Sequence, residues 1–143
     1  MKSLGVVVAA GGLLITATVL MAQDRGGYPD VRGQWKGSSE AAVVGSGPHN
    51  RTDGKSGEPR ASNQEFTLNI TRQEGPKFWG ELVSKSEVTT KLGVIASDTQ
   101  TIYMVDNVGG HNTGRFIEPA KFELCYIRPG KEHMLTGCTV FHR

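Results

Sequence analysis

After residue 30 the chain alternates between apolar and polar residues with a period of two, the period of a β-strand with one buried face. The clearest run covers residues 65–71, where Phe66, Leu68 and Ile70 share one face. Similar strand-like runs cover residues 31–45, 77–83, 88–95, 101–105, 113–117, 122–127 and 134–141. Turn residues separate these runs, and no segment has a sustained helical period. The pattern therefore predicts an all-β protein.

Short strands that follow one another at spacings of roughly 8–12 residues are typical of an eight-stranded antiparallel up-and-down barrel or of a β-sandwich. We favour the barrel, because closure removes the exposed sheet edges through which small proteins pair and aggregate. The β-sandwich is the alternative fold. An eight-stranded barrel has an interior just wide enough for side chains or for one small ligand.

The first 22 residues differ from the rest of the chain. Lys2 precedes a stretch without any charged residue that runs from Leu4 to Ala22. A positive start, an apolar stretch and a small final residue are the pattern of a secretory signal peptide. We therefore predict a signal peptide over residues 1–22 and a protein that is periplasmic or extracellular. The alternative is an uncleaved N-terminal anchor; after cleavage we expect no stable membrane span.

The remaining chain divides into a short leader and one domain. Residues 23–30 are polar and contain Gly and Pro, which predicts a leader without a core of its own. Residues 31–143 have the length of a single barrel domain. Within that domain, residues 45–64 hold almost no apolar side chain and several Gly and Pro, which predicts a flexible loop.

Two cysteines, Cys125 and Cys138, lie in the last two strand-like runs. In an exported protein, two nearby thiols usually form a disulfide. A Pro-Gly turn signal separates the two runs, and pairing of Arg128 with Leu135 places Cys125 directly opposite Cys138. We therefore predict a disulfide within a hairpin, with two separately buried thiols as the alternative. Because the chain has no Cys-x-x-Cys motif, the pair is not assigned a catalytic role.

The charge balance excludes some functions. Sixteen Lys and Arg against 14 Asp and Glu give a net charge of +2, which is too small for a dedicated nucleic-acid binder. The chain has no phosphate-binding glycine loop and no nucleophile motif. Its four histidines, His49, His111, His133 and His142, do not stand at metal-ligand spacing. We expect solvated histidines in the loops, no metal, no catalytic residue and no cofactor.

Gly33 and Trp35 form a Gly-x-Trp motif at the start of the first predicted strand, and Arg143 ends the last one. This combination resembles the calycin superfamily, which includes lipocalins and avidins. The resemblance implies a barrel in which Trp35 closes one end and Arg143 packs across it, so that both residues are structural. The chain is also similar to small periplasmic metalloprotease inhibitors built on such a barrel. That resemblance implies residues 23–30 as the segment inserted into a protease.

Four aromatic residues are the candidates for lining a ligand cavity: Trp79, Tyr103, Phe116 and Tyr126. An amphipathic ring offers a ligand both an apolar face and a polar handle. The alternative for each of them is an ordinary place in the core.

The sequence as a whole predicts an exported, non-enzymatic binding protein for a small apolar or amphipathic ligand. One alternative is a protein-interaction module, such as a periplasmic protease inhibitor, that uses residues 23–32 or 45–64. The other is a small barrel enzyme, which requires polar groups that point into the cavity. We favour the binding protein because the chain contains no recognisable catalytic motif.

Overall fold

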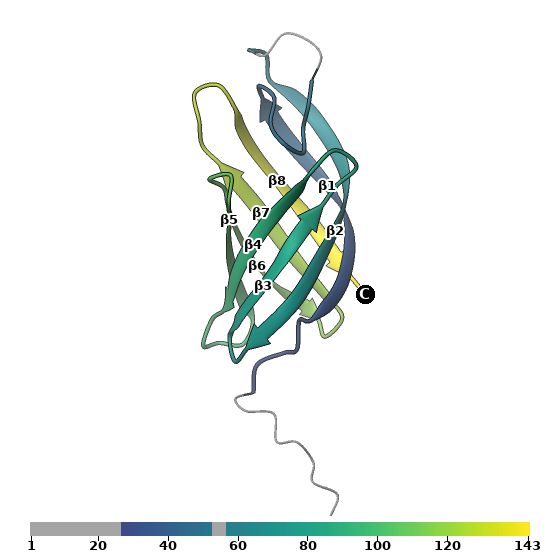
Figure 1. The fold of residues 1–143 in the computed structure, drawn as a ribbon, viewed down its shortest axis with the longest axis vertical. Helices are drawn as coiled ribbons and strands as arrows, with labels where there is room; N and C mark the ends of the chain where they lie inside the picture. The colour runs from purple at the N-terminus through teal and green to yellow at the C-terminus, as the bar shows by residue number, and fades with distance from the viewer. Residues whose placement is uncertain (1–26, 53–56) are drawn as a thin grey trace, which may run out of the picture.

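The computed structural model describes residues 27–52 and 57–143 (Figure 1). The predicted signal peptide, its cleavage site and the first part of the predicted leader lie outside these described residues. Within them, no helix is long and apolar enough to cross a membrane.

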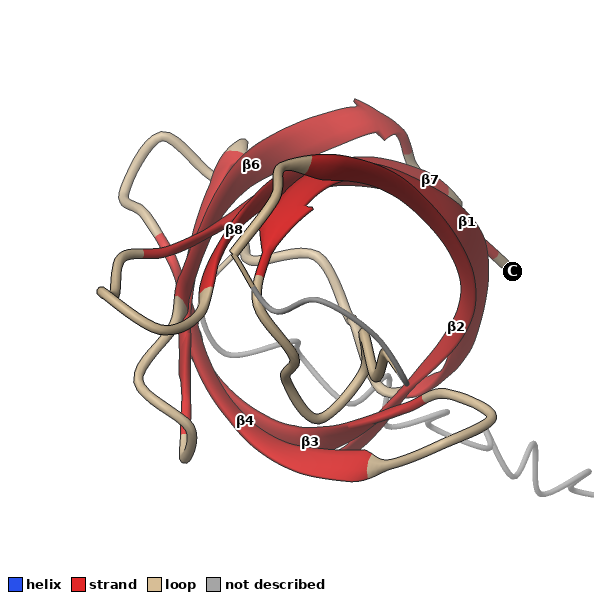
Figure 2. Cartoon of the chain, turned by 90° about the horizontal axis from the view of Figure 1, so that it is seen from above, coloured by secondary structure: helices blue, strands red, loops and turns tan. Residues whose placement is uncertain are grey.

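The described chain forms one antiparallel sheet that closes on itself (Figures 1 and 2). Each strand pairs with the next one in sequence, and the first strand also pairs with the last. The strands are β1 (Gly33–Val44), β2 (Arg60–Glu74), β3 (Lys77–Val83), β4 (Val88–Ile95), β5 (Thr101–Asp106), β6 (His111–Glu118), β7 (Lys121–Arg128) and β8 (Met134–His142). The predicted eight-stranded up-and-down barrel is confirmed, and the β-sandwich is excluded.

The loop predicted over residues 45–64 is shorter in the structure. Strand β2 already begins at Arg60, and Ser39 pairs with Gln64 while Val43 pairs with Arg60. The paired residues 60–64 are mostly polar, because this end of the barrel has a polar interior. A strand with polar residues on both faces has no hydrophobic alternation, so its sequence gives the pattern of a loop.

Side chains alternate between the interior and the outer surface, and the buried apolar core lies at the end of the barrel where β1 begins and β2 ends, the lower end in Figure 1. Phe122 is central to this packing, with ring centroids 4.5 Å from Trp35 and 5.5 Å from Phe141. Gly93 leaves the space that the Phe78 ring occupies, because a Cβ at this glycine would collide with the ring. The buried core consists of Val31, Trp35, Leu68, Ile70, Phe78, Ile95, Ile102, Met104, Phe122, Leu124 and Phe141.

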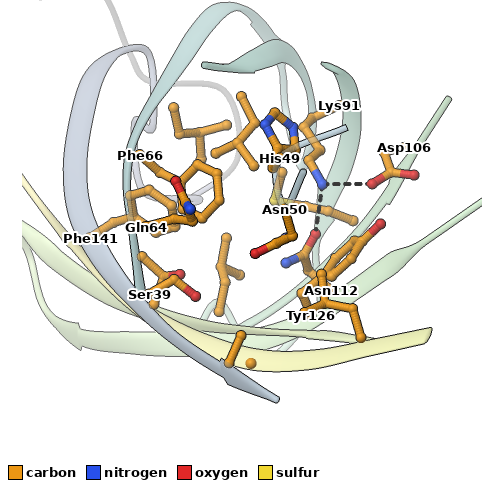
Figure 3. Close-up of a pocket in the computed structure, with 18 of the residues that line it drawn as sticks. Ser39, His49, Asn50, Gln64, Phe66, Lys91, Asp106, Asn112, Tyr126 and Phe141 are labelled. Carbon is orange, nitrogen blue, oxygen red and sulfur yellow. Dashed lines mark hydrogen bonds and ion pairs between the residues drawn. The ribbon is translucent and has the colours of Figure 1, made fainter. Parts of the chain in front are cut away.

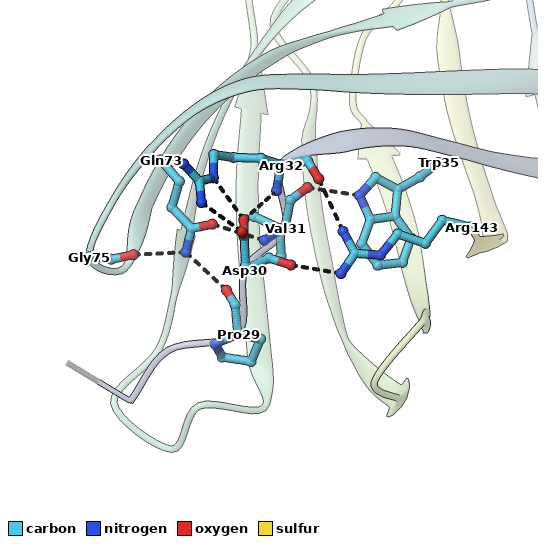
Figure 4. Close-up of polar contacts among 8 residues, drawn as sticks. All are labelled: Pro29, Asp30, Val31, Arg32, Trp35, Gln73, Gly75 and Arg143. Atoms are coloured by element: carbon cyan, nitrogen blue, oxygen red, sulfur yellow. Dashed lines mark hydrogen bonds and ion pairs between the residues drawn. The ribbon is translucent and has the colours of Figure 1, made fainter. Parts of the chain in front are cut away.

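Trp35 and Arg143 close the lower end of the barrel together (Figure 4). The Trp35 side chain is fully buried, and its indole Nε1 donates a hydrogen bond of 2.8 Å to the Val31 carbonyl. The Arg143 guanidinium lies 4.3 Å from the centre of the Trp35 ring. Its two terminal nitrogens donate to the carbonyls of Arg32 and Asp30, each at 3.0 Å. The geometry that the calycin resemblance implies for this pair is present.

The end of the predicted leader is fixed to the same end of the barrel. The Gln73 side chain accepts a hydrogen bond from the Val31 amide at 2.8 Å and donates one to the Pro29 carbonyl at 2.9 Å (Figure 4). The Asp30 carboxylate pairs with the Arg32 guanidinium at 2.7 Å. Hydrogen bonding to Arg32 holds the pKa of Asp30 at about 2. Residues 29–32 therefore form part of the barrel base.

The cysteine hairpin has the predicted register. Arg128 pairs with Leu135, and Cys125 lies directly opposite Cys138 between β7 and β8. The two residues form a disulfide with a Cα–Cα distance of 4.0 Å. The bond lies on the outer side of the barrel wall, because the neighbouring Leu124 faces the interior.

We predict that Arg143→Ala lowers the free energy of unfolding by about 1–2 kcal/mol, because it removes two charge-assisted hydrogen bonds and the cation–π contact with Trp35. Arg143→Lys should restore only a small part of this loss, since an ammonium group cannot stack and bond to both carbonyls at once. Urea unfolding measures the effect. Arg115→Ala, on the exposed side of β6, is the control and should change stability by less than about 0.5 kcal/mol. Equal stability of the two alanine variants contradicts the role of Arg143.

Candidate functional site

The upper half of the barrel interior contains a cavity of about 50 Å³ (Figure 3). This volume is well below the roughly 300–1,000 Å³ of pockets for drug-sized ligands, so the cavity suits one small molecule. Its apolar wall is formed by Phe66, Leu82, Met104, Leu124, Leu135 and Phe141. Uncharged polar side chains also line it, namely Ser39, Asn50, Ser62, Gln64, Asn112 and Thr139.

A buried ion pair between Lys91 and Asp106 lies on one side of this cavity. The two residues are direct cross-strand neighbours on β4 and β5, and both side chains are only 2% exposed. The Lys91 Nζ donates to Asp106 Oδ2 at 2.9 Å and to Asn112 Oδ1 at 3.2 Å. It also lies 4.7 Å from the centre of the Tyr126 ring. Strands β4 to β7 each contribute one of these four side chains.

Asp106 is held in place by the loop that follows its strand. Its Oδ1 accepts hydrogen bonds from the backbone amides of Val108 at 3.1 Å and Gly110 at 2.8 Å. The Tyr126 hydroxyl also bonds to this carboxylate. Gly110 permits that approach, because a Cβ at this position would overlap the Tyr126 hydroxyl. Both carboxylate oxygens of Asp106 are therefore occupied by groups of the protein itself.

The pKa values in this cluster follow from burial and pairing. Burial lowers the pKa of Lys91, and the attraction of Asp106 opposes this shift. Burial acts to raise the pKa of Asp106, but Lys91 and the hydrogen bonds to the carboxylate outweigh it, and the net pKa is lowered. Burial and the bond to Asp106 raise the pKa of Tyr126. At neutral pH the carboxylate is ionised, and the Tyr126 hydroxyl keeps its proton and donates a hydrogen bond to Asp106.

A turn between β1 and β2 covers the upper end of the cavity. His49 bonds through Nδ1 to the Ser84 hydroxyl at 2.7 Å and through Nε2 to the Thr89 hydroxyl at 2.9 Å. The Asn50 side chain is buried and accepts a hydrogen bond of 2.6 Å from Ser62. Arg60 fixes the backbone of the turn by donating to the Asn50 carbonyl at 3.0 Å. The expectation that His49 is a solvated loop residue was wrong, because its ring is bonded inside the mouth of the barrel.

Only one of the four predicted ligand-binding residues lines this cavity. Tyr126 does so and contacts Lys91. Phe116 packs edge-on against Phe122 in the core, with a centroid distance of 5.8 Å. Trp79 lies beneath the Arg72 guanidinium on the outer face, and the Tyr103 side chain is 49% exposed on the outer side of β5. Among the described residues, the structure therefore brings Tyr126 to the site and leaves the other three away from it.

Lys91, Asp106, Asn112 and His49 were not predicted from the sequence, and for Lys91 the cause is that β4 reverses the usual rule of burial. Its apolar residues Val88, Leu92 and Val94 face outward, whereas Thr89 and Lys91 face inward. A prediction based on hydrophobic alternation therefore assigns the two faces of β4 the wrong way round. One signal was available in the sequence: Lys91 stands four residues before Ile95, in the same phase of the strand period, so an inward-facing Ile95 places Lys91 in the interior as well.

Comparisons with known proteins add little. No protein-family model and no curated protein matches the sequence. Among solved structures, the chain is similar to an S-type phycobiliprotein lyase from Guillardia theta. The sequence identity is 12%, the TM-score is 0.35, and the match covers 79% of this chain and 88% of that one. A likeness at this level carries no inference about function.

We predict that Lys91→Met destabilises the barrel by about 3–5 kcal/mol, because it leaves the Asp106 carboxylate buried without a counter-charge. Adding Asp106→Asn should recover at least about 1 kcal/mol of this loss, since the asparagine Oδ1 still accepts from the loop amides and carries no charge. A double-mutant cycle measured by urea unfolding tests both statements. Additive effects of the two substitutions contradict the coupling.

We predict that the stability of the barrel falls as the pH drops from 7.5 towards 5. Burial, and then the positive charge of Lys91, lower the pKa of His49 in the folded state. Burial also lowers the pKa of His133, with a further contribution from Arg128 and Arg60. Unfolded histidine titrates near 6.5, so below that pH the unfolded chain binds more protons and the free energy of unfolding decreases until the folded pKa is reached.

Thermal unfolding at several pH values measures this loss, and His49→Gln should make it smaller. Thr90→Ser, at an exposed position of β4 without a titratable group, is the control and should leave the pH dependence unchanged. The carboxylates whose pKa is lowered, such as Asp106, lose their contribution only below about pH 4, outside this window. A His49→Gln variant with the full pH dependence of the unmodified protein contradicts the role of His49.

Proposed function

We propose that this chain is an exported, non-enzymatic binding protein that holds one small amphipathic molecule in the upper half of a calycin-like barrel. One observation carries the proposal: a cavity with an apolar wall on one side and the buried Lys91 cluster on the other, above a solid base. Such a lining suits a molecule with an apolar body and one polar end.

Two features support export and the calycin-like character. The uncharged stretch from Leu4 to Ala22 is typical of a signal peptide, and the disulfide between β7 and β8 suits an oxidising compartment. The packing of Arg143 across Trp35 is the arrangement that the calycin resemblance implies.

The state of the polar cluster favours binding over catalysis. Lys91, Asp106 and Tyr126 are joined to one another, and the remaining oxygen of Asp106 is taken by loop amides. A general base needs a free lone pair within reach of the substrate, and this carboxylate offers none. The base of the barrel likewise gives little support to protein interaction through the leader, because residues 29–32 are bonded to Gln73 and Arg143.

We predict that small amphipathic compounds of about four non-hydrogen atoms, the size that a cavity of about 50 Å³ admits, raise the melting temperature of the exported protein in a concentration-dependent manner. Ala41→Leu should abolish this effect, because Ala41 lines the cavity and a larger side chain there fills it. Ala42→Leu is the matched control, since Ala42 is exposed on the opposite face of the same strand. A thermal-shift screen measures the effect.

The proposal is wrong if none of the compounds stabilises the protein. It is also wrong if the Ala41→Leu variant, once shown to be folded, is stabilised as strongly as the Ala42→Leu variant.

A further inference from the structure

The charge of the cavity lining is balanced before any ligand enters. Among the described lining residues, Lys91 and Asp106 carry the formal charges, and they neutralise one another at 2.9 Å. The pKa of His49 is lowered, so this ring is neutral at neutral pH and adds no charge. The cavity therefore lacks an unbalanced charge that could compensate a charged ligand.

The lining presents donors rather than acceptors at its polar side. Two of the three ammonium protons of Lys91 go to Asp106 and Asn112. Within the described chain, the remaining proton has only the face of the Tyr126 ring, 4.7 Å away, as its partner. A ring face is a weaker acceptor than a carbonyl oxygen. Because the Asn112 oxygen already accepts from Lys91, its amide nitrogen is a second donor at the same place.

Acceptors at this polar side are occupied. Asp106 accepts from Lys91, Val108, Gly110 and Tyr126, which uses both of its oxygens. A ligand group that donates a hydrogen bond finds no free carboxylate oxygen beside Lys91, whereas a group that accepts one can take the remaining proton of Lys91.

We propose, on the basis of the function proposed above, that the polar end of the ligand is a neutral carbonyl group whose oxygen accepts a hydrogen bond from Lys91. The apolar body of this small ketone, ester or amide packs against the wall that includes Phe66 and Leu124.

An anionic ligand is disfavoured by the same geometry. A carboxylate that reached Lys91 would lie close to the fixed Asp106 carboxylate and would bring a net negative charge into a buried site. Like charges at such a distance repel, and the ligand also loses its hydration. The Lys91 side chain therefore selects a neutral acceptor, although an unpaired lysine in the same place would attract an anion.

Three probes of equal shape, each with four non-hydrogen atoms, test this selection: acetone with a neutral carbonyl, isobutene without an acceptor, and acetate with a negative charge. Titrations followed by ¹⁵N–¹H NMR at pH 7.5 give the three affinities for the exported protein. We expect acetone to bind about tenfold more tightly than isobutene, as one charge-assisted hydrogen bond implies, and at least tenfold more tightly than acetate.

The double variant Lys91→Met/Asp106→Asn removes both charges together, so that it folds without an unpaired charge. In this variant the affinities for acetone and isobutene should agree within about twofold. Lys36→Met, on the outer face of β1, is the control and should leave all three affinities unchanged.

The possible results separate the two proposals. Binding of acetate as tight as that of acetone, or equal binding of isobutene and acetone to the unmodified protein, overturns the carbonyl selection and leaves the binding function standing. Unchanged discrimination in the double variant overturns the role of Lys91. Absence of binding by all three probes overturns the binding function together with this inference.

Discussion

Closure of the sheet is the constraint on which the other features of this molecule depend. Once β1 pairs with β8, every second residue of every strand faces a narrow interior, whatever its polarity. At the lower end these positions hold Trp35, Phe122 and their neighbours, which fill the space. At the upper end they hold Lys91, Asp106 and Asn112, which have to satisfy one another because water has little access.

The fold could be predicted from the sequence because most strands keep a clean alternation, and the hairpin with Cys125 and Cys138 has the register that its turn dictates. The site could not be predicted in the same way. Lys91 lies on a strand whose apolar residues Val88, Leu92 and Val94 face outward. The hydrophobic alternation therefore predicts, wrongly, that Lys91 faces solvent. His49 lies in a segment without apolar residues, whose order comes from bonds to Ser84 and Thr89, far away in the sequence. Local patterns contain no information on such distant partners.

The buried ion pair matters for folding and, under the proposed function, also for recognition of the ligand. The barrel can hold Lys91 in its interior only because Asp106 lies opposite and is itself held by the amides of its loop. The same pairing cancels the positive charge of Lys91 that a ligand would otherwise meet. It leaves one ammonium proton that is bonded neither to Asp106 nor to Asn112. Under the proposed function, the requirement for a stable interior therefore also determines which polar group of a ligand the cavity would accept.

The disulfide supports the site from outside the wall. Cys125 lies between Leu124 and Tyr126, and Cys138 lies between Gly137 and Thr139, all four of which line the cavity. Joining the two cysteines on the outer surface therefore fixes the inward positions on β7 and β8 relative to each other. This matters most for Tyr126, whose ring contacts Lys91 and whose hydroxyl bonds to Asp106, because a shift of β7 would disturb both interactions at once. The solid base and the covalent link across the β7–β8 hairpin together hold the polar cluster in one arrangement before a ligand binds.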